Sequence, residues 1–382
     1  MSRPTSLRTP TPSVRSETRR VAAVTGEKQY TRQEQEPATD EITELAPGVL
    51  RTQLPVELPG LGHVNCYFLE DERGVAVVDP GLPGPASWNA LLDRLKRAGF
   101  ELRHVHTAIV THSHFDHFGG APQLRAEADT DIVTHESFRD TFEARELFED
   151  HDSGLLENND DDNIDHVREL MRRPKPWGGR WSPPNDDDLR AFMKMGRRAK
   201  RFRVPDPSVT VVDTQVITLA RREWIAVHTP GHTADHLCLY DPVEKLFISG
   251  DHVLPTITPH IAGHSPGGAI VDPLARFFES LRHMHDFDVE LVLPAHGHPF
   301  KDLAGRADHI LEHHHERLDI IRDAADDLPE GTVADYMRRL FRERSWGDMA
   351  ESETFAHLEH LRIAGEATSF ERDGMTMYRL PT

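Results

Sequence analysis

Four side chains that can bind a metal ion lie within six consecutive positions of this chain. They are His112, His114, Asp116 and His117, and they follow directly after the apolar run Thr107–Val110. Imidazole and carboxylate groups together suit zinc or a similar divalent cation. Packing does not explain these residues, because each would bring an unsatisfied polar group or a charge to the end of a buried strand. The segment therefore predicts a dinuclear metal site.

A site for two ions needs more ligands than this segment holds, and the rest of the chain offers them at the ends of other apolar runs. These runs are Gly74–Val78, Trp224–Val227, Lys245–Gly250 and Val289–Ala295, and the polar residues that follow them include Asp79, His232, Asp251 and His296. Short apolar runs of this kind predict buried strands. Polar residues at the ends of several strands are typical of an active site along one edge of packed sheets.

In order and spacing, these residues resemble the motifs of the metallo-beta-lactamase superfamily, from about Gly48 to about Lys301. The resemblance implies an α/β fold, the αβ/βα sandwich, in which two mixed sheets pack face to face with helices outside and metals at one edge. Carried over position by position, it assigns His112, His114 and His232 to a first metal, Asp116, His117 and His296 to a second, and Asp251 to both. Asp79 would support the ligand loop by accepting hydrogen bonds.

The resemblance also implies the chemistry. Two zinc ions would lower the pKa of a shared water toward about 7, and the resulting hydroxide would attack an electrophilic carbon or phosphorus. Asp116 would be the catalytic residue that orients this nucleophile. We expect hydrolysis of a carbonyl ester, above all a thioester, with a small-molecule or carrier-bound acyl substrate. The open alternatives are a metal-dependent endoribonuclease, a lactonase and a mononuclear iron persulfide dioxygenase, and iron or manganese in place of zinc.

Charge and composition restrict the partners of this chain. Its 382 residues carry a formal net charge of -20 at pH 7. An acidic surface repels phosphate backbones, so nucleic-acid binding is not expected. No apolar stretch approaches the roughly 18 residues of a membrane span, which predicts a cytoplasmic protein without membrane contact. Cys66 and Cys238 lie in apolar segments and are expected to be buried free thiols. Nothing in the sequence specifies an oligomeric state.

Three regions are expected along the chain. Residues 1–40 are rich in Ser, Thr, Pro, Arg and Gln and predict a disordered arm. Residues 41–301 would form the hydrolase domain, with a long insertion over 138–207. Trp177 and Trp181 of this insertion are either substrate-binding walls of a lid over the metals or anchors that pack the insertion onto the core. The insertion also holds an acidic run at 158–162 and a basic cluster at 194–203.

Residues 302–382 predict a small α+β module. Apolar residues at helical spacing predict helices over Ala307–Ala325, around Val333–Phe341 and around Phe355–Leu361. Ala367–Leu380 predicts a hairpin with Asp-Gly at its turn. This order resembles a winged-helix-like module. Such a module follows the core in a branch of the superfamily that includes a beta-lactamase-like endoribonuclease and thioesterases acting on carrier-bound polyketides, and the core itself is similar to glyoxalase-II-like members.

Overall fold

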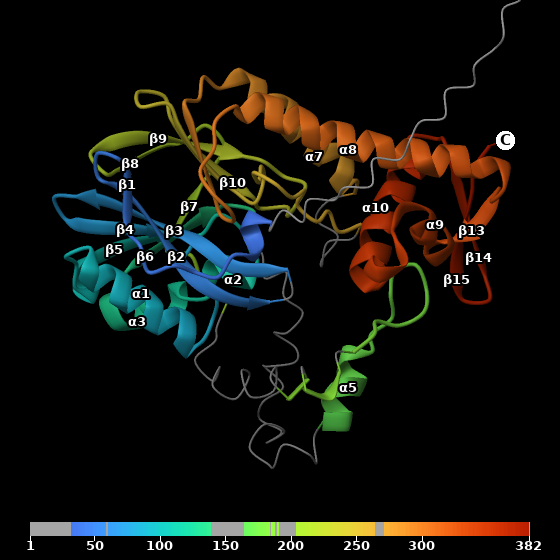
Figure 1. Ribbon diagram of the computed structural model, residues 1–382, viewed down its shortest axis with the longest axis horizontal. Coiled ribbons are helices and arrows are strands. Elements are labelled where there is room, and N and C mark those ends of the chain that lie inside the picture. Colours follow the sequence, from blue (N-terminus) through green and yellow to red (C-terminus); the bar gives the residue numbers. More distant parts are fainter. Residues whose placement is uncertain are drawn as a thin grey trace, which may run out of the picture. The chain divides into compact units, whose positions relative to one another are not determined.

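The structure is a computed structural model that describes residues 32–58, 60–138, 164–183, 185–187, 189–190, 204–263 and 271–381. These residues belong to one compact unit that begins at Arg32. Two β-sheets pack face to face, helices cover their outer faces, and a small third sheet lies near the C-terminus (Figure 1). No described helix has the length and apolarity that crossing a membrane requires. Cys66 and Cys238 are buried free cysteines, as predicted.

The first sheet has seven strands in the order β1-β2-β3-β4-β5-β6-β7. They are β1 Thr43–Ala46, β2 Val49–Leu58, β3 Leu61–Asp71, β4 Gly74–Val78, β5 Val105–Ile109, β6 Asp131–His135 and β7 Val209–Val211. The pairs from β1 to β4 are antiparallel, and those from β4 to β7 are parallel. The connections from β4 to β6 hold α1 Pro85–Arg97, the 3-10 helix η2 Leu102–His104, α2 Phe115–Phe118 and α3 Ala121–Ala128.

Alternate residues of β4 face two different cores. Val77 belongs to the apolar cluster that contains Leu91 of α1. Val78 belongs to the cluster between the sheets, which contains Trp224. Successive side chains of a strand point to opposite faces, so an unbroken apolar run such as Gly74–Val78 fills both cores at once.

The second sheet has five strands in the order β12-β11-β10-β9-β8. They are β8 Val216–Leu219, β9 Arg222–His228, β10 Leu237–Asp241, β11 Leu246–Gly250 and β12 Leu291–Pro294. Its outer face is covered by α7 Pro273–His283, the 3-10 helix η6 Met284–Asp286 and α8 Leu303–Asp323. There Phe277 and Ile310 share an apolar cluster with Phe247 of β11. The predicted αβ/βα sandwich is thereby confirmed.

The C-terminal region contains the predicted helices and hairpin. After α8 come η7 Ala324–Asp326, β13 Glu330–Thr332, α9 Val333–Leu340, η8 Glu343–Ser345, α10 Asp348–Ile363, β14 Thr368–Arg372 and β15 Met375–Arg379. The sheet order is β13-β15-β14. Strand β13 was not predicted, because a three-residue strand carries too little periodic signal. Tyr378 of β15 lies in the same apolar cluster as Phe247, so one core continues past residue 301. The winged-helix identity stays a prediction.

The structure describes residues 32–40, the last part of the arm predicted to be disordered over residues 1–40. Gln33–Gln35 form the 3-10 helix η1. The Glu34 side chain is buried and accepts hydrogen bonds from the backbone N–H groups of Thr256 and Ile257. The contact could not be predicted from composition, because one buried carboxylate produces no periodic apolar pattern.

The insertion predicted over 138–207 is described in part. Its helix α5 Ile164–Met171 precedes a turn in which Gly178 forms a bridge with Met375 of β15. A Cβ on Gly178 would lie 2.4 Å from the carbonyl oxygen of Gly374, so the turn is in direct contact with the C-terminal hairpin. The acidic run at 158–162 and the basic cluster at 194–203 lie outside the described residues.

Candidate metal centre

Strand direction gathers the candidate ligands at one edge of the sandwich. In the second sheet β10 is antiparallel to both β9 and β11, and β12 is parallel to β11. Strands β9, β11 and β12 therefore end at the same edge, followed in sequence by His232, Asp251 and His296. In the first sheet β4 and β5 are parallel, and Asp79 and the loop that starts at Thr111 follow them.

Two glycines close the loop after β5. They are Gly119 and Gly120, which follow the short helix α2. A Cβ on Gly119 would lie 2.1 Å from Pro83 N, and a Cβ on Gly120 would lie 2.4 Å from Pro80 O. Glycine is needed here because the loop after β5 packs directly against the loop after β4.

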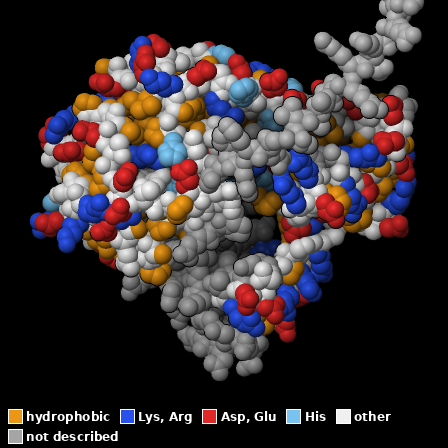
Figure 2. Space-filling view, in the orientation of Figure 1, with side chains coloured by type: hydrophobic (Ala, Val, Ile, Leu, Met, Phe, Trp, Pro, Cys, Tyr) orange, Lys and Arg blue, Asp and Glu red, His pale blue; other side chains and the backbone are white. Residues whose placement is uncertain are grey.

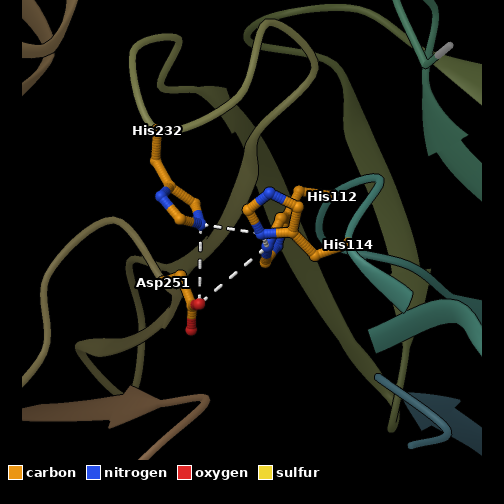
Figure 3. Close-up of side chains that lie close together, drawn as sticks. All are labelled: His112, His114, His232 and Asp251. Carbon is orange, nitrogen blue, oxygen red and sulfur yellow. Dashed lines mark hydrogen bonds and ion pairs between the residues drawn. The ribbon is translucent and has the colours of Figure 1, made fainter. Parts of the chain in front are cut away.

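The first group of candidate ligands consists of His112, His114, His232 and Asp251, whose side chains point toward one another (Figure 3). His114 Nδ1 lies 3.0 Å from His112 Nε2 and 3.0 Å from His232 Nε2. Asp251 Oδ2 lies 3.6 Å from His232 Nε2 and 3.9 Å from His112 Nε2. All four ligand atoms lie within 4.8 Å of one another. Three imidazole nitrogens and a carboxylate oxygen at this spacing suit a tetrahedral cation.

The second group consists of Asp116, His117 and His296. Asp116 Oδ2 lies 3.6 Å from His117 Nε2 and 3.5 Å from His296 Nε2. Asp251 reaches this group too, because its Oδ2 is 3.6 Å from His117 Nε2 and its Oδ1 is 3.5 Å from His296 Nε2. All seven residues predicted to bind metal therefore lie together, with Asp251 between the two groups.

Three buried atoms of these groups lack a hydrogen-bond partner among the described residues: His117 Nε2, His296 Nε2 and Asp251 Oδ1. Leaving one buried polar group unsatisfied costs about 1–3 kcal/mol. Three unpaired atoms in one site therefore destabilise the fold unless a bound ion or molecule interacts with them. Their chemistry, two imidazole nitrogens and a carboxylate oxygen, fits a divalent cation.

Protein acceptors hold the far side of three of the rings. These hydrogen bonds run from His232 Nδ1 to His260 O at 2.8 Å, from His296 Nδ1 to His63 O at 2.7 Å, and from His117 Nδ1 to Asp79 Oδ2 at 2.9 Å. A neutral ring that donates from Nδ1 has its lone pair on Nε2, which is the atom that faces the group.

Burial and neighbouring charges give His112, His114 and Asp116 the protonation states that suit metal binding. At His117 and His296 burial is outweighed by the carboxylates of Asp116 and Asp251, which raise the pKa of both rings. Burial lowers the pKa of His112 well below its usual range and that of His114 to about 3, so both rings are neutral at pH 7. Burial works against the ionised form of Asp116, but the neighbouring His117 and His296 rings lower its pKa to about 2. Neutral imidazoles and ionised carboxylates are the forms in which these residues bind cations.

Asp79 makes the contacts that its predicted supporting role requires. Its Oδ1 accepts a hydrogen bond from Thr111 N, and its Oδ2 accepts from Thr111 Oγ1 and from His117 Nδ1, each at 2.9 Å. The backbone of Asp79 has a φ of 52°, in the left-handed region that Asp tolerates better than most residues. One buried carboxylate thus fixes the start of the ligand loop and one of its rings.

Two further residues next to the groups were not predicted. His236 Nε2 accepts a hydrogen bond from Asp251 N at 3.0 Å, and its ring stacks on that of His112 with 5.0 Å between centroids. Asp235 Oδ1 accepts a hydrogen bond from Ser113 Oγ at 2.9 Å. Both residues join loops that carry candidate ligands. Asp235 and His236 could have been suspected from the sequence, because they lie close to His232. They were not predicted, because single polar residues after a strand are usually turn residues.

The tryptophans of the insertion pack against the C-terminal region. Trp177 is 1% exposed, its ring centroid lies 4.9 Å from that of Phe355, and its Nε1 donates a hydrogen bond to Glu351 Oε2 at 3.0 Å. Trp181 is partly buried, with its ring centroid 5.3 Å from that of Trp177. These contacts are those of a packing anchor. A part for either residue in substrate binding stays a prediction.

Comparison with known proteins agrees with this geometry. The family model described as the metallo-beta-lactamase superfamily matches residues 59–296. The chain belongs to the metallo-beta-lactamase superfamily. The matched segment contains both groups of candidate ligands. The predicted membership of this superfamily is thereby confirmed.

The chain is similar to a fungal protein and to two bacterial proteins of known structure. It is 26% identical over 286 residues to Lactamase-like protein adaB of Aspergillus niger, a match that covers 74% of this chain and 64% of that protein. The chain therefore spans less than two thirds of that relative. A beta-lactamase domain protein of Burkholderia ambifaria matches with a TM-score of 0.70 and 26% identity over 91% of this chain and 96% of the other. A metallo-beta-lactamase family protein of Thermus thermophilus has a TM-score of 0.66 and 24% identity, covering 88% and 100%.

Proposed function

We propose that this enzyme holds two zinc ions and hydrolyses carbonyl esters, with thioesters as its preferred class. The position of Asp251 carries the proposal, because its Oδ2 lies 3.6 Å from His232 Nε2 and also 3.6 Å from His117 Nε2. A carboxylate between two groups of imidazoles is placed to bridge two cations. In this assignment His112, His114 and His232 would hold one ion, Asp116, His117 and His296 would hold the other, and Asp251 would contribute to both.

The bound cations would supply Lewis acidity, which makes water a nucleophile at neutral pH and polarises the carbonyl of the substrate. The side chains orient the reactants. Asp116 is ionised, so it can accept a hydrogen bond from the attacking water and hold it in line with the carbonyl carbon. The hydrogen bonds from His232 to His260 O and from His296 to His63 O keep both rings in fixed orientations during turnover.

Two cations account for the side chains better than one iron. A single iron needs only one face of ligands, two histidines and a carboxylate. An iron held by the first group would leave the buried atoms His117 Nε2 and His296 Nε2 of the second group unpaired. Zinc also suits a group rich in imidazole better than manganese, which favours carboxylates and water.

The charges of the C-terminal region favour an acyl substrate over RNA. Arg372 and Arg379 both pair with Glu330, at 2.8 and 2.9 Å, and Arg322 pairs with Glu366 at 2.7 Å. Arginines that are already paired add little counterion release on binding a phosphate backbone. Basic and acidic side chains are intermixed on the face shown in Figure 2. The net charge of -20 acts in the same direction.

The proposed substrate is a small-molecule or carrier-bound thioester, in a cytoplasmic setting. The resemblance to glyoxalase-II-like and carrier-thioesterase members supports this class. A lactone presents the same electrophilic carbonyl to the same site, so a lactonase is the nearest competitor. The shared requirement is a carbonyl carbon that Asp116 and the oriented water can approach together.

The test is a substrate panel with full-length protein that has been reconstituted with zinc. An acyl thioester, a lactone, a beta-lactam and single-stranded RNA are supplied at equal concentrations. We expect a kcat/KM for the thioester at least about tenfold above the others, a difference of about 1.4 kcal/mol in transition-state binding. The matched variant Asp116→Asn should lose this activity. Cleavage of RNA without thioester hydrolysis contradicts the proposal.

A further inference from the structure

The loop after β11 contains no helix or strand, yet charged residues from distant parts of the chain hold it. This loop covers residues 252–263. Glu34 of η1 accepts a hydrogen bond from Ile257 N at 3.2 Å. Arg306 of α8 donates to Leu254 O and to Ile257 O, each at 2.7 Å. Side chains from the N-terminal and the C-terminal regions therefore determine the path of this loop.

His260 connects the loop to the metal centre and to helix α10. Its carbonyl oxygen accepts the hydrogen bond from His232 Nδ1 at 2.8 Å. Its ring Nδ1 lies 3.7 Å from Glu353 Oε2 of α10. The Glu353 side chain is 12% exposed and forms an ion pair with Arg317 of α8. Burial opposes its ionised form, but His260 and Arg317 hold the pKa of Glu353 well below its usual range.

The residues after His260 pack tightly on α10. Ile261 is fully buried in the apolar cluster that contains Phe355. A Cβ on Gly263 would lie 2.5 Å from Phe355 Cδ1 and 2.6 Å from Ala356 N. With no room between this segment and the helix backbone, the position of the His260 carbonyl depends on the position of α10.

We infer that the C-terminal region is part of the metal centre and that Glu353 is a positioning residue for His232. Glu353 Oε2 lies 3.7 Å from the ring Nδ1 of His260, and the His260 carbonyl accepts the hydrogen bond that orients the His232 ring. His232 Nε2 then points to the other ligand atoms of the first group. The inference rests on the proposed metal site and gives the C-terminal helices a task other than holding substrate. Partners that orient a metal ligand typically change metal affinity or activity 10–100-fold. Because Glu353 acts one contact further away, we expect the lower end of that range.

The chain offers a matched control in Glu359 of the same helix. Glu359 pairs with Arg362 at 2.8 Å and is 19% exposed, close to the 12% of Glu353. It also accepts a hydrogen bond from Tyr378. Both partners belong to the C-terminal region. E359Q therefore removes one partly buried, arginine-paired carboxylate charge from α10, as E353Q does. The partners of Glu359 are Arg362 and Tyr378 and do not include His260.

The experiment is a cobalt(II) titration of full-length, metal-free protein against a competing chelator, followed by the absorption bands of the bound cobalt. E353Q is expected to raise the dissociation constant of the first cobalt about tenfold and to shift its absorption bands. E359Q is expected to match wild type in both, although either substitution lowers the melting temperature. E353D keeps a charge for Arg317 and should recover part of the cobalt affinity. If E353Q does not fold, E353D carries the test with a smaller expected shift.

Wild-type cobalt affinity and spectrum in E353Q overturn the inference. An equal loss in E353Q and E359Q also overturns it, because general loosening of α10 then explains both. H232A distinguishes this failure from failure of the metal site. If H232A binds two cobalt ions as wild type does, the proposed metal site is wrong. If H232A loses the first cobalt and E353Q does not, the site stands and Glu353 has no positioning role.

Discussion

Asp79 Oδ2 accepts a hydrogen bond from His117 Nδ1 at 2.9 Å, which fixes a ring of the second group from the end of a neighbouring strand. Asp79→Asn keeps the size of the side chain and tolerates the φ of 52°. If the amide nitrogen of Asn takes the place of Oδ2, two hydrogen-bond donors face each other, this nitrogen and His117 Nδ1. We expect binding of the second ion to weaken about 10–100-fold, with the first ion retained. Zinc titration against a chelator measures both affinities, and two unchanged affinities speak against the role of Asp79.

Asp251→Asn should weaken the binding of both metal ions. The carboxylate lies 3.6 Å from His232 Nε2 in the first group and 3.6 Å from His117 Nε2 in the second. A neutral amide is a poor substitute for a charge shared between two cations. The metal content of the purified variant, measured by mass spectrometry, is the readout. Loss of one ion while the other keeps its native affinity would show that Asp251 does not bridge.

His112→Ala should remove the first ion and reduce hydrolysis to background, because it deletes one of three imidazoles of that group. The control is His135→Ala, since His135 is also a buried histidine but stacks on His228, with centroids 3.7 Å apart, instead of joining either group. This control should retain two ions. Full activity and full metal content in His112→Ala, or metal loss in both variants, contradict the assignment.

Trp177→Ala should destabilise the protein by about 3–5 kcal/mol, the usual cost of truncating a buried tryptophan. Trp177 is 1% exposed, whereas Trp346 is 42% exposed, so Trp346→Ala serves as the matched control. We expect the control to change stability by less than about 1 kcal/mol. Chemical denaturation measures both variants. A Trp177→Ala protein of normal stability with a raised KM for bulky substrates would instead support the lid over the metals.

The candidate site residues could be recognised in the sequence because they are chemically distinctive. His112, His114, Asp116 and His117 have no packing explanation, and the other candidates follow apolar runs that β4, β9, β11 and β12 confirm as strands. Strands that run in the same direction end at the same edge, so the position of each residue after a strand already implied the cluster.

Contacts made by single polar residues were beyond prediction. Glu34, His236 and Glu353 each act through a few polar contacts to residues that only the fold brings near. The sequence also could not distinguish the two roles proposed for Trp177, because a tryptophan in a lid and a tryptophan in a core give the same sequence pattern. Its partner Glu351 is 174 residues away along the chain.

The metal content of the native protein tests the central claim most directly. Full-length protein purified without added metal or chelator is analysed by mass spectrometry for zinc, iron and manganese per chain. Two zinc ions per wild-type chain, and one in the variant His232→Ala, are the predicted result. One iron per chain, or no metal bound after dialysis against micromolar zinc, would contradict a dinuclear zinc centre.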